Sequence, residues 1–220
     1  MDTVTEAPRS GLKVLNLDAV KAGKVSTEPY RYVICEGVLT PENAAAIRAD
    51  FPQTTSVGFL NSTDLSREGA YAALLDDLES PELAAVLSEK LDLDLSKAGR
   101  LITVRRWSRK TDGRIHTDSE RKISTFLVYL NETWSAADCG AFRVLRGEKD
   151  FEDYVAEVPP IQGHAVGFKR ADHSWHGHKP FEGERLVVQL TYLQSAEAAE
   201  HKRRAAGFQG FMKKLFERVG

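Results

Sequence analysis

The sequence predicts a mainly β fold with helices on both sides of the β region. From residue 101 onward, short apolar runs recur about every 8 to 12 residues, separated by turn-like segments. That rhythm is typical of β-sandwiches and barrels, and eight strands suit a jelly roll, a double-stranded β-helix core. We expect the strands at 101–107, 114–118, 123–131, 140–146, 153–158, 164–169, 173–178 and 185–193.

The residues before 101 follow a different sequence pattern. Residues 1–27 are polar apart from a short apolar stretch at 12–17, and we expect a flexible arm or an edge element there. Residues 30–38 are rich in strand formers. The segment 28–100 as a whole is expected to give helical N-terminal support to a core at 101–194.

Two helices are expected in this support. Thr40 can cap the first and Pro41 fits its first position, and Ser80 with Pro81 repeats the same start signal. Apolar residues then recur at helical spacing in both segments. Residues 52–79 lie between the two helices, and their sequence predicts neither a helix nor a strand.

The C-terminal segment, 195–220, predicts one amphipathic helix. Its apolar residues lie at steps of three and one along the chain, at Phe208, Phe211, Met212, Leu215, Phe216 and Val219. We expect this helix to pack against the barrel or against a second copy of the chain, which would make a homodimer. Binding to a membrane surface is a further alternative. The whole chain is expected to form one domain.

Composition excludes several classes of protein. With 220 residues, a net charge of −2 and no long block of one charge, nothing indicates nucleic-acid binding. No apolar run is long enough to cross a bilayer, and residues 1–10 lack the apolar segment of a secretory signal. The two cysteines, Cys35 and Cys139, give no disulfide framework. We therefore expect a cytoplasmic location.

A histidine and an aspartate two residues apart, His116 and Asp118, begin the candidate site. On a strand, positions i and i+2 project from the same face, so both side chains can reach one metal ion. Two histidines and one carboxylate, with open positions left, form the arrangement of non-haem Fe(II) oxygenases. An isolated match is weak, since Asp118 can also cap a turn and His116 can lie at the surface.

A second segment, sixty residues on, supplies further candidates. His176 could complete the metal set across a jelly roll, and Arg185 at the start of the next strand would lie deeper in the same cavity. The guanidinium of a buried arginine suits a bidentate carboxylate. The alternative for Arg185 is a surface ion pair with a neighbouring glutamate. His173 and His178 flank His176 and are rival ligands, or residues at the mouth of the site.

These residues together resemble the 2-oxoglutarate/Fe(II)-dependent dioxygenases of the prolyl 4-hydroxylase type. The family pattern is HxD, a histidine about sixty residues later, and an arginine or lysine about ten beyond it. Here the pattern is similar at His116, Asp118, His176 and Arg185, and the segments 127–134 and 140–145 resemble the family's YLN…W…GG-L-R stretch. The resemblance covers roughly residues 101–193.

The resemblance implies a cupin-like jelly roll and an enzyme with Fe(II), 2-oxoglutarate and O2, and with ascorbate as a possible stimulant. His116, Asp118 and His176 would be the iron ligands, Arg185 would bind the distal carboxylate of 2-oxoglutarate, and Tyr129 would hydrogen-bond the same carboxylate or be a core aromatic residue. Because Asp118 is present, we expect hydroxylation of a C–H bond, with formation of succinate and CO2.

The substrate is left open by the sequence. A small molecule or metabolite is expected, and a protein or peptide, as for a prolyl hydroxylase, is the alternative; a non-catalytic metal-binding jelly-roll module is a third. The chain departs from its relatives at Gly140-Ala141, where they have paired glycines, and at 105–107, Arg-Arg-Trp, where the oxygen-sensing relatives place a tyrosine. Loop placement favours 52–79 and 133–140 as substrate contacts.

Overall fold

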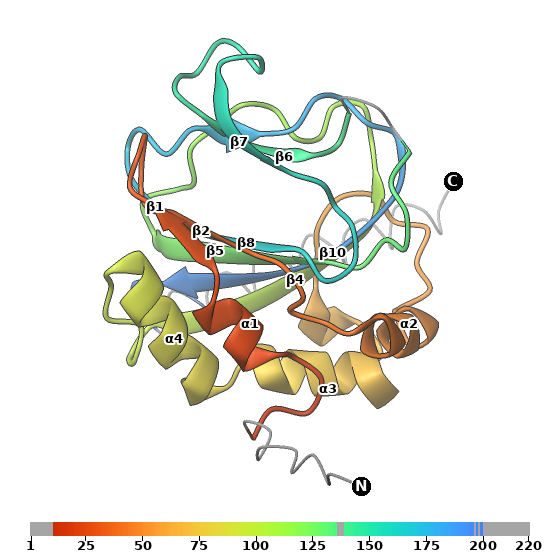
Figure 1. Cartoon of the computed structure of the whole chain (residues 1–220). Helices are drawn as coiled ribbons and strands as arrows, with labels where there is room; N and C mark the ends of the chain where they lie inside the picture. Colours follow the sequence, from red (N-terminus) through yellow and green to blue (C-terminus); the bar gives the residue numbers. More distant parts are fainter. Residues whose placement is uncertain (1–10, 136–138, 196, 198, 200–220) are drawn as a thin grey trace, which may run out of the picture.

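The computed structural model describes residues 11–135, 139–195, 197 and 199, and these form two antiparallel sheets and a layer of helices (Figure 1). The major sheet has the strand order β1 (Lys24–Ser26), β2 (Tyr32–Cys35), β8 (Ala165–Lys169), β5 (Lys122–Tyr129), β10 (Gly183–Leu193), β4 (Gly99–Ser108) and β3 (Leu60–Asn61). The minor sheet has the order β7 (Tyr154–Val158), β6 (Phe142–Leu145) and β9 (His176–Gly177). The prediction of a mainly β jelly-roll core is confirmed.

The helices cover the face of the major sheet that points away from the minor sheet (Figure 1). They are α1 (Leu17–Lys21), α2 (Pro41–Ala49), α3 (Gly69–Leu78) and α4 (Pro81–Leu91), with a 3-10 turn, η1 (Ser62–Asp64). Both expected helix starts are present. Thr40 Oγ1 accepts from the backbone N–H of Asn43 at 3.1 Å, and Ser80 Oγ accepts from that of Leu83 at 3.1 Å.

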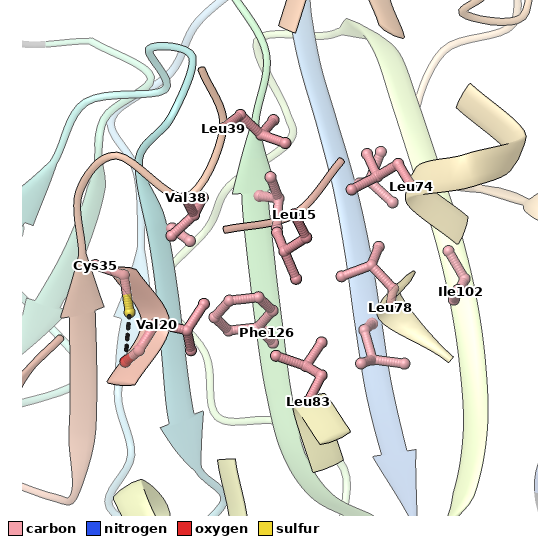
Figure 2. Packing of buried hydrophobic residues seen from close by; sticks show 14 of the residues in the cluster. Leu15, Val20, Cys35, Val38, Leu39, Leu74, Leu78, Leu83, Ile102 and Phe126 are labelled. Carbon is pink, nitrogen blue, oxygen red and sulfur yellow. Dashed lines mark hydrogen bonds between the residues drawn. The ribbon is translucent and has the colours of Figure 1, made fainter. Parts of the chain in front are cut away.

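Two apolar layers hold these parts together. The larger lies between helices and major sheet, where Phe126 of β5 is surrounded by Val20, Val38 and Leu83 (Figure 2). The smaller lies between the two sheets and is rich in aromatic residues, including Tyr129, Phe142 and Phe168. Because successive residues of a strand point to opposite faces, each strand of the major sheet contributes to both layers.

The expected strands are present with one exception. The segment 114–118 forms no strand, and only His116 pairs, in a single antiparallel bridge with His176. Gly113 explains the break, since its φ of +79° turns the chain and the His178 ring occupies the space that a Cβ would need. Before residue 101, β2 lies within 30–38, where strand formers are concentrated, and β1 and β3 are two further strands of the major sheet whose positions the sequence did not indicate.

Within residues 52–79, which the sequence left unplaced, the structure has α3. Its start carries no side-chain cap of its own; instead, the carboxylate of Asp50 accepts from the backbone N–H of Ala70 at 2.6 Å. In the N-terminal segment, Leu15 and Leu17 are core residues. The carboxylate of Asp77, on α3, accepts from three consecutive backbone N–H groups, those of residues 13–15.

The C-terminal helix expected over 195–220, with its apolar stripe at 208–219, lies outside the described residues except for 195, 197 and 199. Among the residues that are described, no helix combines the length and the apolar character needed to cross a bilayer.

Candidate active site

The two metal-ligand candidates with imidazole rings are placed by one backbone pairing. His116 and His176 exchange both N–H···O bonds, each at 3.0 Å, and the next pair holds His178 N–H on the carbonyl of Gly113 at 2.8 Å. Such a pairing brings the two side chains to the same side of the ladder. The ring centroids of His116 and His176 are 4.4 Å apart. Residues sixty positions apart are thus fixed side by side.

Each ring presents its Nε2 atom for coordination. His116 Nδ1 lies 2.7 Å from the carbonyl oxygen of Arg114, and His176 Nδ1 lies 2.9 Å from that of Ser174. A carbonyl oxygen only accepts, so both Nδ1 atoms carry the proton and donate it. This arrangement orients a histidine ligand and leaves an unprotonated Nε2 for a metal.

Asp118 completes the set. One ligand atom from each of His116, Asp118 and His176 lies within 4.8 Å of the others, which is close enough to hold one metal ion. Asp118 Oδ2 accepts from Thr125 Oγ1 at 2.7 Å, and Oδ1 accepts from Lys122 Nζ. These contacts orient the carboxylate from behind. The donor set, two imidazoles and one carboxylate on one side, fits Fe(II) and leaves further coordination positions open.

Burial sets the charge of these groups. It lowers the pKa of the His176 imidazole to about 4, against the opposing effect of Asp118, so the ring is neutral at pH 7 and ready to coordinate. Burial acts to raise the pKa of Asp118, but Lys122 and His176 outweigh it and hold that pKa below its usual range. Phe168 lies 4.5 Å from the His176 ring, centroid to centroid, and keeps this side of the site apolar.

The triad opens onto a cavity of about 220 Å³ between the two sheets. Its wall combines the three metal-ligand candidates with two arginines, Arg105 and Arg185, and with apolar side chains. A separate cavity of about 420 Å³ is lined by residues of the 131–135 loop and by Arg48, Phe181 and Glu184, and contains none of the triad. The smaller cavity is therefore the one that can carry metal chemistry.

Arg185 is the buried arginine that the sequence predicts, with 3% of its surface exposed. Its Nε donates to the carbonyl of Gly140 at 2.9 Å, and its guanidinium lies 5.3 Å from the centre of the Tyr129 ring. Among the described residues no carboxylate forms an ion pair with it. Glu184 pairs with Arg106 at 2.8 Å instead. Burial lowers the pKa of Arg185 against the opposing effects of Tyr129 and Asp112.

Tyr129 lies beside this arginine on β5. Its ring is fully buried in the layer between the sheets, and its hydroxyl interacts with the Arg185 side chain but forms no well-aligned hydrogen bond within the described chain. Burial raises the pKa of Tyr129, while the charge of Arg185 acts in the opposite direction. The hydroxyl is thus neutral and available as a donor to a carboxylate held by Arg185.

The rival histidines differ in position. His173 is exposed, whereas His178 is buried, lines the cavity and has an Nε2 atom without a hydrogen-bond partner in the described chain. Burial lowers the pKa of His178 to about 3, and the charge of Arg185 acts in the same direction. Neither ring belongs to the cluster that could hold a metal.

Sequence reasoning missed several residues of the site. Thr125, which orients Asp118, and Gln189, which lines the cavity, were not singled out, and Arg105 was noted only as a departure from the relatives. Alternation along the strands could have indicated both residues. Thr125 projects from the same face of β5 as Leu127, and Gln189 projects from the same face of β10 as Val187.

Comparisons with known proteins agree with this geometry. Residues 102–192 match the family described as the 2OG-Fe(II) oxygenase superfamily. No curated protein sequence matches the chain.

Three solved structures are similar in fold. A prolyl-4-hydroxylase from Pseudomonas putida has a TM-score of 0.60 and 18% identity, covering 84% of this chain and 96% of that one. A prolyl 4-hydroxylase from Phytophthora capsici has a TM-score of 0.59 and 17% identity, covering 97% and 79%. A prolyl hydroxylase from Trichoplax adhaerens, solved with a peptide fragment of the hypoxia inducible factor oxygen degradation domain, has a TM-score of 0.54 and 16% identity, covering 86% and 91%.

Proposed function

We propose that this chain is a 2-oxoglutarate- and Fe(II)-dependent dioxygenase with a prolyl 4-hydroxylase-like fold, and that it hydroxylates a C–H bond of a small molecule. Succinate and CO2 are the accompanying products. One observation carries the proposal: the three candidate ligand atoms lie within 4.8 Å of each other in a cavity that also holds a buried arginine without a carboxylate partner among the described residues.

Each residue has a separate task in this proposal. His116, Asp118 and His176 hold the iron, which supplies the oxygen chemistry when bound. Arg185 binds the distal carboxylate of 2-oxoglutarate, and the Tyr129 hydroxyl donates to the same group. Phe168 and Phe142, stacked at 5.6 Å, keep water away from the His176 side of the cavity. Asp118 occupies one coordination position with a carboxylate, which favours hydroxylation over transfer of a halide.

The size of the cavity supports a small substrate. About 220 Å³ is below the range of roughly 300–1,000 Å³ that drug-sized ligands occupy, so only a small molecule or the end of a larger one fits beside 2-oxoglutarate. A peptide substrate is the second candidate, because the Trichoplax adhaerens neighbour was solved with a peptide.

Turnover of 2-oxoglutarate tests the proposal. The purified chain with Fe(II) should form succinate slowly without substrate, and His176→Ala and Asp118→Ala should abolish both this turnover and iron binding. His173→Ala is the matched control, since its exposed ring should leave both unchanged. If the wild-type chain, prepared without oxygen, binds no iron and forms no succinate, the chain is a non-catalytic jelly-roll module instead.

Two finer features are also proposals. The two cysteines, Cys35 and Cys139, are free thiols, which supports a cytoplasmic location. A homodimer through the C-terminal segment rests on its sequence alone.

A further inference from the structure

A row of polar side chains follows the edge of the major sheet beside the cavity. Asn61 of β3 pairs in register with Thr103 of β4, and Thr103 pairs with Gln189 of β10, which lines the cavity. Residues directly opposite one another in a sheet project from the same face. Arg105, two residues beyond Thr103, therefore projects from this face too, and its side chain lines the cavity.

Three atoms of this row are buried without a hydrogen-bond partner in the described chain. They are Asn61 Nδ2, Thr103 Oγ1 and Arg105 Nε. Buried polar groups are nearly always hydrogen-bonded, and each one left unpaired costs about 1–3 kcal/mol. All three can donate. Arg105 lines the cavity itself, and Thr103 and Asn61 lie on the same face of the sheet next to Gln189, so the row indicates an acceptor that binds at this end of the cavity during function.

Arg105 is also poorly neutralised. Its nearest carboxylate oxygen, on Asp112, is 3.8 Å away, and the same carboxylate accepts from the backbone N–H of Arg109 at 3.0 Å. The other contacts of its guanidinium are Ser108 Oγ at 3.4 Å and the face of the Phe59 ring at 4.2 Å. Burial, with the nearby charge of Arg185, lowers the pKa of Arg105 to about 10, so it remains charged at pH 7.

The charge balance of the cavity assigns this arginine a ligand of its own. The following step rests on the proposed function. The two charges of Fe(II) are cancelled by those of the 2-oxoglutarate dianion, and the charge of Asp118 by that of Lys122. Of the two remaining arginine charges, that of Arg105 is compensated only in part, because Asp112 is shared with Arg109, which lies closer to it. The positive charge that remains matches a carboxylate ligand.

We propose that Arg105, Asn61 and Thr103 form the binding subsite for a carboxylate of the primary substrate. The substrate is then a small carboxylic acid whose reacting C–H bond lies within the same cavity. The carboxylate oxygens accept from the Arg105 guanidinium, the Asn61 amide and the Thr103 hydroxyl. Phe59, half exposed at the outer side of Arg105, covers the guanidinium from solvent.

Binding to protein loaded with Mn(II) and 2-oxoglutarate tests the subsite without turnover. The probes are small aliphatic and aromatic monocarboxylic acids and, for each, its carboxamide, which differs chiefly in the loss of the carboxylate charge. Calorimetry should find at least one acid that binds at least about tenfold more tightly than its carboxamide, as expected for a charge-assisted hydrogen bond. If no acid of the set is preferred over its carboxamide, the proposal is overturned.

Three variants separate this subsite from the binding of 2-oxoglutarate. Arg105→Gln should remove the preference for the acid. Thr103→Val should weaken acid binding by at least about threefold while the fold is retained, because the hydroxyl has no partner to lose. Ser124→Ala removes a hydroxyl that is also buried and without a partner among the described residues but projects from the other face of the sheet, and should change neither acid binding nor 2-oxoglutarate binding.

The same measurements distinguish the two proposals. If 2-oxoglutarate binds normally to the Mn(II) protein but acids are not preferred, only the carboxylate subsite fails. If Arg105→Gln weakens 2-oxoglutarate binding as much as Arg185→Gln does, Arg105 belongs to the 2-oxoglutarate site and the subsite proposal is wrong. If 2-oxoglutarate does not bind to the wild type at all, the proposed function fails first.

Discussion

The two faces of the major sheet bury charged side chains in opposite ways. On the helix face, Asp77 is 2% exposed, and its carboxylate accepts from the backbone N–H groups of residues 13–15 at 2.7–2.8 Å. On the cavity face, Arg185 is 3% exposed, and the described chain offers its Nε one carbonyl and its charge no carboxylate. A buried charge that is satisfied within the fold serves the fold, and one that is not is available for a ligand.

The largest expected effect is on the cavity face. Arg185→Gln should weaken 2-oxoglutarate binding to the Mn(II) protein by at least about 30-fold, since loss of one partner of a buried charge pair costs about 2–5 kcal/mol. Mn(II) binding itself should change little, because Arg185 is not among the residues that could hold the metal. Calorimetric titration of metal and then of 2-oxoglutarate measures both. A larger loss of metal affinity than of 2-oxoglutarate affinity would mean that Arg185 is not the anchor.

The same kind of change on the helix face should affect stability instead. Asp77→Asn should lower the free energy of unfolding by about 2–4 kcal/mol, because a charged acceptor of three backbone N–H groups, buried or partly buried, is replaced by a neutral one. Urea unfolding measures the loss, and 2-oxoglutarate binding by the folded protein should be unchanged. The neighbouring Asp76, which is exposed and paired with Lys13, is the control and should cost no more than about 1 kcal/mol when changed to Asn.

Adjacent hydroxyls on opposite faces sharpen the comparison further. Thr125 donates to Asp118 at 2.7 Å, so Thr125→Val should lower metal affinity by about 10- to 100-fold, the usual cost of losing a group that orients a metal ligand. Ser124, the preceding residue, faces the helices, and Ser124→Ala should leave metal affinity as it was. Equal losses in the two variants would indicate a general loss of structure and no role of Thr125 in orienting the carboxylate.

The sequence predicted the jelly roll and the helix starts for physical reasons that are local. Alternating apolar runs mark strands, and Thr40 and Ser80 are caps that lie next to the helices they start. The closeness of His116 and His176 depends on a pairing between distant segments, and it could be inferred only because the spacing resembles that of a known family.

What the sequence could not predict depends on tertiary contacts. The start of α3 is capped by Asp50 from twenty residues away, and residues 13–15 are held by Asp77, so neither element has a local signal. The polar row at the sheet edge likewise has no local indication in the sequence. Asn61 and Thr103 lie together only because β3 pairs with β4, and alternation shows which face a residue occupies only once that register is known.

At pH values near 9, the smallest predicted effect is a pH dependence of stability on the helix face. Burial raises the pKa of the Cys35 thiol to about 12, and its Sγ lies 3.9 Å from the carbonyl oxygen of Val20 (Figure 2). The unfolded chain releases this proton near pH 9 and the folded chain does not.

The stability due to Cys35 is therefore complete below pH 9 and is lost as pH rises toward 12, with a slope that approaches about 1.4 kcal/mol per pH unit. Urea unfolding at pH 8, 9 and 10 should show a steeper decline for the wild type than for Cys35→Ala, which lacks the thiol. Parallel declines would mean that the Cys35 thiol is open to solvent. The helix face would then not be closed to water, as the comparison with the cavity face assumes.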